Sequence, residues 1–266
     1  MELCFLPNEI LILIAESREE RNDCLSLARC CRLFYETLMP LAFTKIELQS
    51  NCQYVLSILV HMLYGTIAML KVWSLNLKLR WCDHPSKPRF KRKLMLEAIR
   101  RLTKSEYNIE SWENYLREKP DTSGWGPTDG WKALLLTLVP NLEVLSIEGE
   151  FISTLRRQVV TKVSRRQRPF ATVLALGRLR EVSLEAGLSV ASGASFLEDD
   201  IIPFLSLPTM CELSCRCFYD SGEYGEEQIP TKCDIDDLAF WDCNSQTGFR
   251  SIVHACKKTE EILLSS

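Results

Sequence analysis

The sequence lacks the usual signals of a secreted protein. Met1-Glu2-Leu3 form no basic n-region, and no Asn-x-Ser/Thr glycosylation acceptor occurs in the 266 residues. We therefore expect the twelve cysteines to stay reduced, as they would in the cytosol or nucleus. Most of them should act as small apolar side chains in the core.

Histidine is scarce, and no catalytic pattern surrounds the three that occur. His61 lies in an apolar run, and His84 precedes Pro85. His254 stands two residues before Cys256, a spacing that does not bring two side chains together on a helix. No Gly-rich phosphate loop, HExxH, GxSxG or EF-hand pattern is present. These absences argue against an enzyme, and the sequence predicts no catalytic residue and no cofactor.

Neither sign of charge is in large excess, since the formal net charge is −3 at pH 7. This argues against a general nucleic-acid or anionic-membrane binder. The basic runs 87–93 and 156–168 are expected to be solvated, with nuclear import or nucleic-acid contact as the less favoured interpretations. The uncharged run 55–70 is shorter than the ~20 residues that cross a membrane, so we expect a buried helix there and no membrane partner.

Residues 4–15 predict an apolar helix that the chain around it cannot cover. Pro7 suits the first turn of a helix, and the acidic Glu9 suits its N-terminal end. Asp23 is expected to cap a second helix, and Pro40 is expected to block its continuation. A unit of about forty residues is too small to bury both faces of its first helix, because the fraction of surface that a chain buries on folding falls with its length. The apolar surface left over predicts an interaction site.

The stretch LPNEILILIAE…NDCLSLARCCRLFYETLMPLAF resembles an F-box, particularly that of the F-box proteins of filamentous fungi. The resemblance rests on the Leu6-Pro7 opening, the acidic Glu9, the SLARCCRLFY helix and the Leu-x-Pro exit. It departs from the family at Arg18, where an apolar residue is usual. It implies that the unit docks on a Skp-type adaptor; a generic helical cap for the repeats is the alternative. The residues implied to contact or shape the adaptor surface are Leu6, Pro7, Ile10, Leu11, Leu25, Leu27, Ala28, Cys31 and Phe34.

The rest of the chain repeats a pattern of three apolar positions, φ-x-x-φ-x-φ. Its last two steps, from 210 to 235 and from 235 to 259, fall inside the period of 20–29 residues that is typical of leucine-rich repeats. Apolar helical stretches and short turns precede several of the motifs, as in units that give parallel strands with helices outside. The motifs are Phe43/Ile46/Leu48, Leu70/Trp73/Leu75, Leu142/Leu145/Ile147, Leu179/Val182/Leu184, Met210/Leu213/Cys215, Ile235/Leu238/Phe240 and Thr259/Ile262/Leu264.

These patterns predict an α/β fold with two parts. Residues 1–48 are the short helical F-box, and residues 49–266 are an irregular leucine-rich-repeat solenoid with insertions near 81–130 and 219–234. The chain ends directly after its last predicted strand, which would leave a bare edge open to pairing. We therefore expect either a truncated C-terminus or a partner over that end.

The alternation along the predicted strands places three columns of side chains on the open side of the sheet. The middle column is small and mostly Ser, and the flanking columns are predominantly acidic, with Trp241 as an aromatic anchor. We predict that this face binds a basic segment of a protein substrate. The residues assigned to it are Glu148, Glu181, Glu185, Glu212, Asp237 and Trp241.

The cysteines at 211, 215, 217, 233 and 243 are the candidate metal ligands. Zinc takes four converging ligands, usually from paired C-x₂₋₄-C motifs, and only Cys211 and Cys215 have that spacing. We expect core packing and no metal.

The F-box followed by repeats resembles the substrate-recognition subunit of an SCF-type (cullin–RING) E3 ubiquitin ligase. The resemblance implies a role in ubiquitin-dependent protein degradation, in the cytoplasm, the nucleus or both. The implied partners are a Skp-type adaptor with its cullin complex and a protein substrate. A leucine-rich-repeat scaffold without a ligase role is the second interpretation, and a zinc- or nucleic-acid-binding module is the third.

Overall fold

A computed structural model gives the fold of the chain. The residues that it describes are 6–17, 21–48, 72–79, 93, 96–97, 100, 128–149, 154–167, 175–186, 196, 198–218, 233–242, 252, 256 and 261–265.

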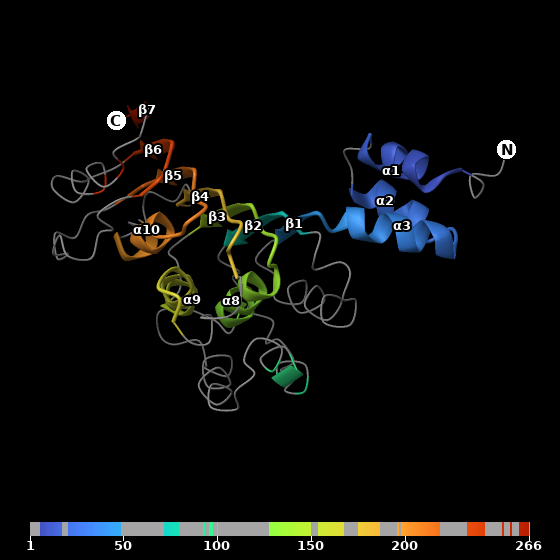
Figure 1. Ribbon diagram of the computed structural model, residues 1–266, viewed down its shortest axis with the longest axis horizontal. Helices are drawn as coiled ribbons and strands as arrows, with labels where there is room; N and C mark the ends of the chain where they lie inside the picture. Colours follow the sequence, from blue (N-terminus) through green and yellow to red (C-terminus); the bar gives the residue numbers. More distant parts are fainter. Residues whose placement is uncertain are drawn as a thin grey trace.

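Three short helices form the N-terminal unit: α1 (Asn8–Glu16), α2 (Arg21–Ala28) and α3 (Arg32–Ala42). The buried side chains of α3, Phe34, Leu38 and Ala42, recur every four residues and so form one apolar stripe along the helix. α3 ends where Thr44 donates to the Leu41 carbonyl oxygen twice, from its backbone N–H at 3.1 Å and from its hydroxyl at 2.7 Å. The chain then passes directly into the first strand (Figure 1).

Two predictions about these helices are wrong. α2 begins at Arg21, so Asp23 lies in its first turn, where a negative charge still favours the helix dipole, and does not cap it. Pro40 lies inside the last turn of α3 and does not end it. A proline in the last turn interrupts only one backbone hydrogen bond, and the buried stripe on α3 keeps the turn helical through Ala42.

Over the described ranges, seven strands form one sheet, and each of them pairs in parallel with the next described strand. They are β1 (Lys45–Leu48), β2 (Ser74–Leu79), β3 (Val144–Gly149), β4 (Glu181–Glu185), β5 (Glu212–Arg216), β6 (Asp237–Trp241) and β7 (Glu261–Ser265). Pairing begins one residue before most strands; for example, the Thr44 carbonyl accepts from the N–H groups of both Trp73 and Ser74. The predicted mixed α/β class with parallel strands is confirmed.

The core side of the sheet is built from three columns of buried apolar side chains. Strand neighbours share these columns because the registers align the motifs residue by residue. The columns are Phe43, Val72, Leu142, Leu179, Met210 and Ile235; then Ile46, Leu75, Leu145, Val182, Leu213 and Leu238; then Leu48, Leu77, Ile147, Leu184, Cys215 and Phe240.

This alignment corrects the predicted register of the second motif. The sequence suggested Leu70, Trp73 and Leu75, which would pair Leu75 with Leu48. In the structure Leu75 pairs with Ile46, so the motif is Val72, Leu75 and Leu77. A shift of two residues keeps the same face inward, and burial of both Val72 and Leu77 favours the observed register over the predicted one.

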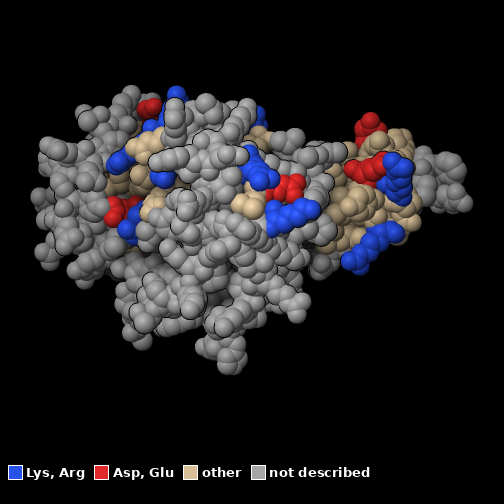
Figure 2. Space-filling view, turned by 90° about the horizontal axis from the view of Figure 1, so that it is seen from below, with Lys and Arg blue, Asp and Glu red and all other residues tan. Residues whose placement is uncertain are grey.

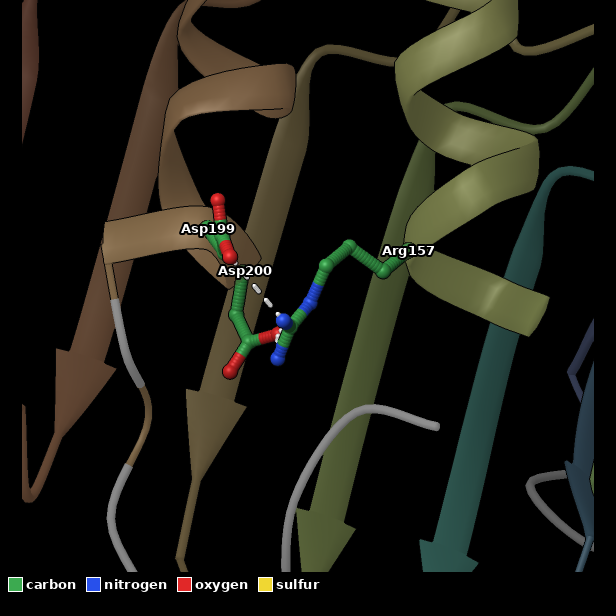
Figure 3. A network of polar contacts seen from close by, with 3 residues as sticks. All are labelled: Arg157, Asp199 and Asp200. Carbon is green, nitrogen blue, oxygen red and sulfur yellow. Dashed lines mark hydrogen bonds and ion pairs between the residues drawn. The ribbon is translucent and has the colours of Figure 1, made fainter. Parts of the chain in front are cut away.

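In the described part of the chain, the helices that pack on the core side of the sheet are α8 (Thr128–Leu138), α9 (Thr154–Ser164) and α10 (Glu198–Leu205), as Figure 1 shows. α9 and α10 are joined by an ion-pair network (Figure 3). Arg157 reaches from α9 to Asp200 at 2.7 Å and to Asp199 at 3.1 Å, both in the first turn of α10. The Asp200 side chain is fully buried, so this network fixes the two helices against each other.

Part of the basic run 156–168 is therefore structural, since Arg157 belongs to this network. Lys162, Arg165 and Arg166 are exposed, as predicted for a solvated run. The run 55–70 and most of the predicted insertions, 81–130 and 219–234, lie outside the described residues. Within the described ranges, no helix has the length and apolar content needed to cross a membrane.

Candidate functional site

The N-terminal helices carry an apolar surface that the rest of the described chain does not cover. Ile10, Leu13 and Tyr35 are 40%, 60% and 53% exposed, and they are the large exposed hydrophobic side chains of the described residues. We call these three residues the helical patch. Ile10 and Leu13 are three residues apart on α1 and so share a face, and Tyr35 is exposed on α3 of the same unit.

The predicted adaptor residues divide by burial. Leu11, Ala28 and Phe34 are buried in the unit's own core, so they hold the helices together and offer no surface to a partner. Pro7 and Ile10 are exposed. The remaining predicted residues are partly buried and pack at the edge of the core: Leu6, Leu25, Leu27 and Cys31.

Leu13 and Tyr35 were missed by the sequence argument. The signal that would have found Leu13 is its position in α1, because Leu11 faces the core and a residue two positions later points away from it. Similarly, Tyr35 follows the buried Phe34 and turns outward. Figure 2 shows that much of the visible surface of this unit carries neither Lys or Arg nor Asp or Glu.

The second surface is the side of the sheet opposite the helices, which we call the open face. The predicted columns are confirmed by the registers from β3 to β6. Half-buried small side chains, Ser183, Ser214 and Ala239, form the middle column over β4 to β6. Small side chains in the middle of the sheet leave room for the backbone of a bound segment.

Three carboxylates stand in register on the open face. Glu181 pairs with Glu212, and Glu212 pairs with Asp237, so the three lie side by side on β4, β5 and β6. All are exposed, and none makes a salt bridge to another described residue. Like charges directly opposite each other on neighbouring strands repel, so a bound cationic group would relieve this arrangement.

Arginines limit the acidity of the same region. Arg180 precedes β4. The hydrogen bond with the Cys211 side chain is the main cause that raises the pKa of Arg180, and the nearby carboxylates of Glu143 and Glu212 raise it further. Arg216 pairs with Asp242 through its Nε at 2.8 Å, and this hydrogen bond raises the pKa of the guanidinium. The acidic surface is therefore concentrated on the column of Glu181, Glu212 and Asp237.

Two other predicted residues of the face have structural neighbours. Glu148 is half-buried and accepts from Asn76 at 3.1 Å, with Lys78 Nζ at 3.5 Å. Its carboxylate is thus occupied within the sheet. Trp241 is half-buried at the end of β6, beside Arg216 in the register, and Glu185 is exposed at the end of β4.

The β1–β2 end of the open face has a different character, which the sequence argument did not describe. Lys78 binds Glu47 at 2.7 Å, and the hydrogen bond with Glu47 raises the pKa of Lys78. Lys45 Nζ lies 5.0 Å from the centre of the Trp73 ring, a cation–π contact. Positive and negative groups alternate here, so the predominantly acidic character predicted for the face is limited to β4–β6.

The candidate metal ligands that lie in the described residues do not converge. Cys215 is buried in the core column, as predicted. Cys217 was expected to point the same way, but it follows the end of β5 with φ 62° and is half-buried, so strand alternation no longer applies to it. Cys243 lies outside the described residues. Among the residues that the structure describes, no three His, Cys, Asp or Glu side chains are grouped as a metal site would need.

The sulfur neighbour of Cys233 is Cys256, which the sequence argument did not connect with it. The three histidines of the chain lie outside the described residues. Comparison with protein-family models, with curated proteins and with solved structures gave no match.

Proposed function

We propose that the chain is the substrate-recognition subunit of an SCF-type (cullin–RING) E3 ubiquitin ligase. In this proposal α1–α3 are an F-box that binds a Skp-type adaptor, and the sheet with its helices is a leucine-rich-repeat solenoid that binds the protein substrate. The chain itself carries out no chemistry: it holds the substrate near the ubiquitin-loaded enzyme and so raises the effective concentration.

The observation that carries the proposal is the location of the helical patch. Ile10, Leu13 and Tyr35 are the large exposed apolar side chains among the described residues, and all three belong to the N-terminal unit. The restriction of these large exposed apolar side chains to one small unit favours a protein-binding surface there. Their position also agrees with the family resemblance of residues 4–48.

The open face supports the second half of the proposal. Its small middle column and the acidic column of Glu181, Glu212 and Asp237 suit an extended protein segment with Lys or Arg side chains. The two surfaces lie on different elements, so one chain has room to bind adaptor and substrate together.

Capture of a purified Skp-type adaptor by the full chain tests the first half. Leu13→Glu and Tyr35→Ala should each weaken capture by about tenfold or more, because exposed anchors at an interface centre contribute on this scale. Lys162→Met is the control, since Lys162 is exposed on α9 and does not belong to the N-terminal unit. Unchanged capture by Leu13→Glu would count against the proposed docking surface.

An immobilised library of Lys- and Arg-containing peptides, with acidic counterparts, tests the second half. The chain should retain basic peptides, and Glu181→Lys with Glu185→Lys should abolish retention while adaptor capture persists. Equal retention of acidic peptides would refute the assignment of the open face. Adaptor binding without ubiquitin transfer to a captured peptide would favour a scaffold without a ligase role.

A further inference from the structure

Two cysteine thiols contact each other in the interior of the C-terminal half. Cys233 precedes β6 and Cys256 precedes β7; the two are 23 residues apart, and their sulfur atoms are separated by 2.6 Å. Both residues are buried, Cys233 at 3% and Cys256 at 2% exposure. No other pair of described cysteines has such a contact.

The backbone on each side holds the pair in place. Three residues beyond Cys233, the N–H of Asp236 donates to the Cys211 carbonyl at 2.8 Å, which anchors the segment to β5. Cys256 donates its own N–H to the Ile252 carbonyl at 3.2 Å, and Ile252 is fully buried. The two thiols therefore meet because the segments that lead into β6 and β7 are both fixed on the same core.

The contact makes the two thiols chemically unequal. The hydrogen bond with Cys256 lowers the pKa of Cys233, and backbone N–H groups add to this effect against the opposing effect of burial. The same contact, together with burial, raises the pKa of Cys256. The lowered pKa favours Cys233 over Cys256 as the attacking thiolate.

We propose that Cys233 and Cys256 are a reversible intrachain disulfide site, closed by a hydroperoxide and opened by a dithiol. The Cys233 thiolate attacks the peroxide oxygen, breaks the O–O bond and becomes a sulfenic acid, while the leaving alkoxide or hydroxide takes up a proton. The Cys256 thiol then attacks the sulfenic sulfur; its proton leaves with the hydroxyl as water, and the S–S bond forms. Two thiols are oxidised, and one peroxide is reduced to an alcohol or water and a second water.

The cross-link would join the segment that leads into β6 to the segment that leads into β7. These strands pair with each other at one end of the sheet, so the oxidised form ties its last strands together covalently. Because both sulfurs are buried, closure should be slower than oxidation of the exposed Cys30 thiol and should depend on local opening. This inference goes beyond the proposed function and does not depend on it.

Peptide mapping of the full chain after graded hydrogen peroxide tests the proposal. Trypsin cuts after Lys232, Arg250 and Lys257, so the cross-link joins the peptides 233–250 and 251–257 with the loss of two hydrogen atoms. The first peptide also contains Cys243, so Cys243→Ser is the matched control and should keep the cross-link. Cys233→Ser should lose it, and dithiothreitol should reverse it in the wild type.

Because Cys30 should react first, the deciding sample is the one taken after prolonged exposure to the highest peroxide dose, when Cys30 is fully oxidised. The proposal is overturned if Cys233 and Cys256 both remain open to alkylation after denaturation of that sample. Fragment ions of the linked wild-type peptides distinguish Cys233 from Cys243, so the result stands even where Cys233→Ser does not fold. The oxidised wild type should also unfold several degrees above the reduced form, since a closed loop of this length restricts the unfolded chain. An equal unfolding temperature of the oxidised and reduced wild type would likewise contradict a cross-link between the segments that lead into β6 and β7.

Discussion

Replacing Arg157 by Met tests whether the α9–α10 ion pair holds the two helices together. The substitution removes the guanidinium and keeps most of the stem, so it leaves the Asp200 carboxylate buried without its 2.7 Å partner. The Asp200 side chain has no exposure, whereas the side chains of Arg157 and Asp199 keep 29% and 35%. Most of the lost stability should therefore come from the broken contact with Asp200.

The magnitude follows from these exposures. Removing one partner of a fully buried ion pair costs about 3–5 kcal/mol, and a surface pair is worth about 1 kcal/mol or less. Arg157 is partly solvated and Asp200 has a further interaction, both of which reduce the cost. We expect Arg157→Met to lower the free energy of unfolding by about 2–3 kcal/mol, measured as a shift of the urea midpoint at constant slope.

Two variants make this result specific. Lys162→Met on the same helix removes an exposed charge and should change stability by less than about 0.5 kcal/mol. Combining Arg157→Met with Asp200→Asn should cost less than the sum of the single changes, because the second change removes the stranded carboxylate. A loss below about 0.5 kcal/mol for Arg157→Met, or strict additivity with Asp200→Asn, would refute the reasoning.

Three further outcomes are expected from the same structure. Leu145→Ala, in the middle core column, should cost about 2–5 kcal/mol in urea unfolding, because a fully buried leucine leaves a cavity. Lys78→Met should destabilise the protein slightly at low salt and not at 1 M salt. Since Glu47 raises the Lys78 pKa, the stabilisation by the Lys78–Glu47 pair is complete below about pH 10 and is lost at higher pH. Cys217→Val should cost more than about 1 kcal/mol, whereas Cys217→Gly should be tolerated, because φ is 62° there.

The sequence pattern was sufficient for most of the sheet. The registers from β3 to β7 agree with the predicted motifs. In β3 to β6 the side chains alternate between a buried and an open face, and a slip by one residue would expose the core. The second motif was misplaced because Leu70, Val72, Leu75 and Leu77 allow two registers that bury the same face. Only the neighbouring strands distinguish between them.

The candidate surfaces were predicted less completely, for a different reason. Residue type alone does not tell which apolar side chains of a short helix face its own unit, so the buried Leu11, Ala28 and Phe34 were grouped with exposed residues, and Leu13 and Tyr35 were missed. Pairings between distant residues were also invisible. Nothing near Arg157 in the sequence points to Asp200, and nothing near Cys233 points to Cys256.

Calorimetric titration of a purified Skp-type adaptor into the full chain tests the central proposal most directly. The account predicts a one-to-one complex, at least a tenfold loss of affinity for Leu13→Glu, and unchanged affinity for both Lys162→Met and Glu181→Lys. No binding by the folded wild-type chain, or equal binding by Leu13→Glu, would contradict it.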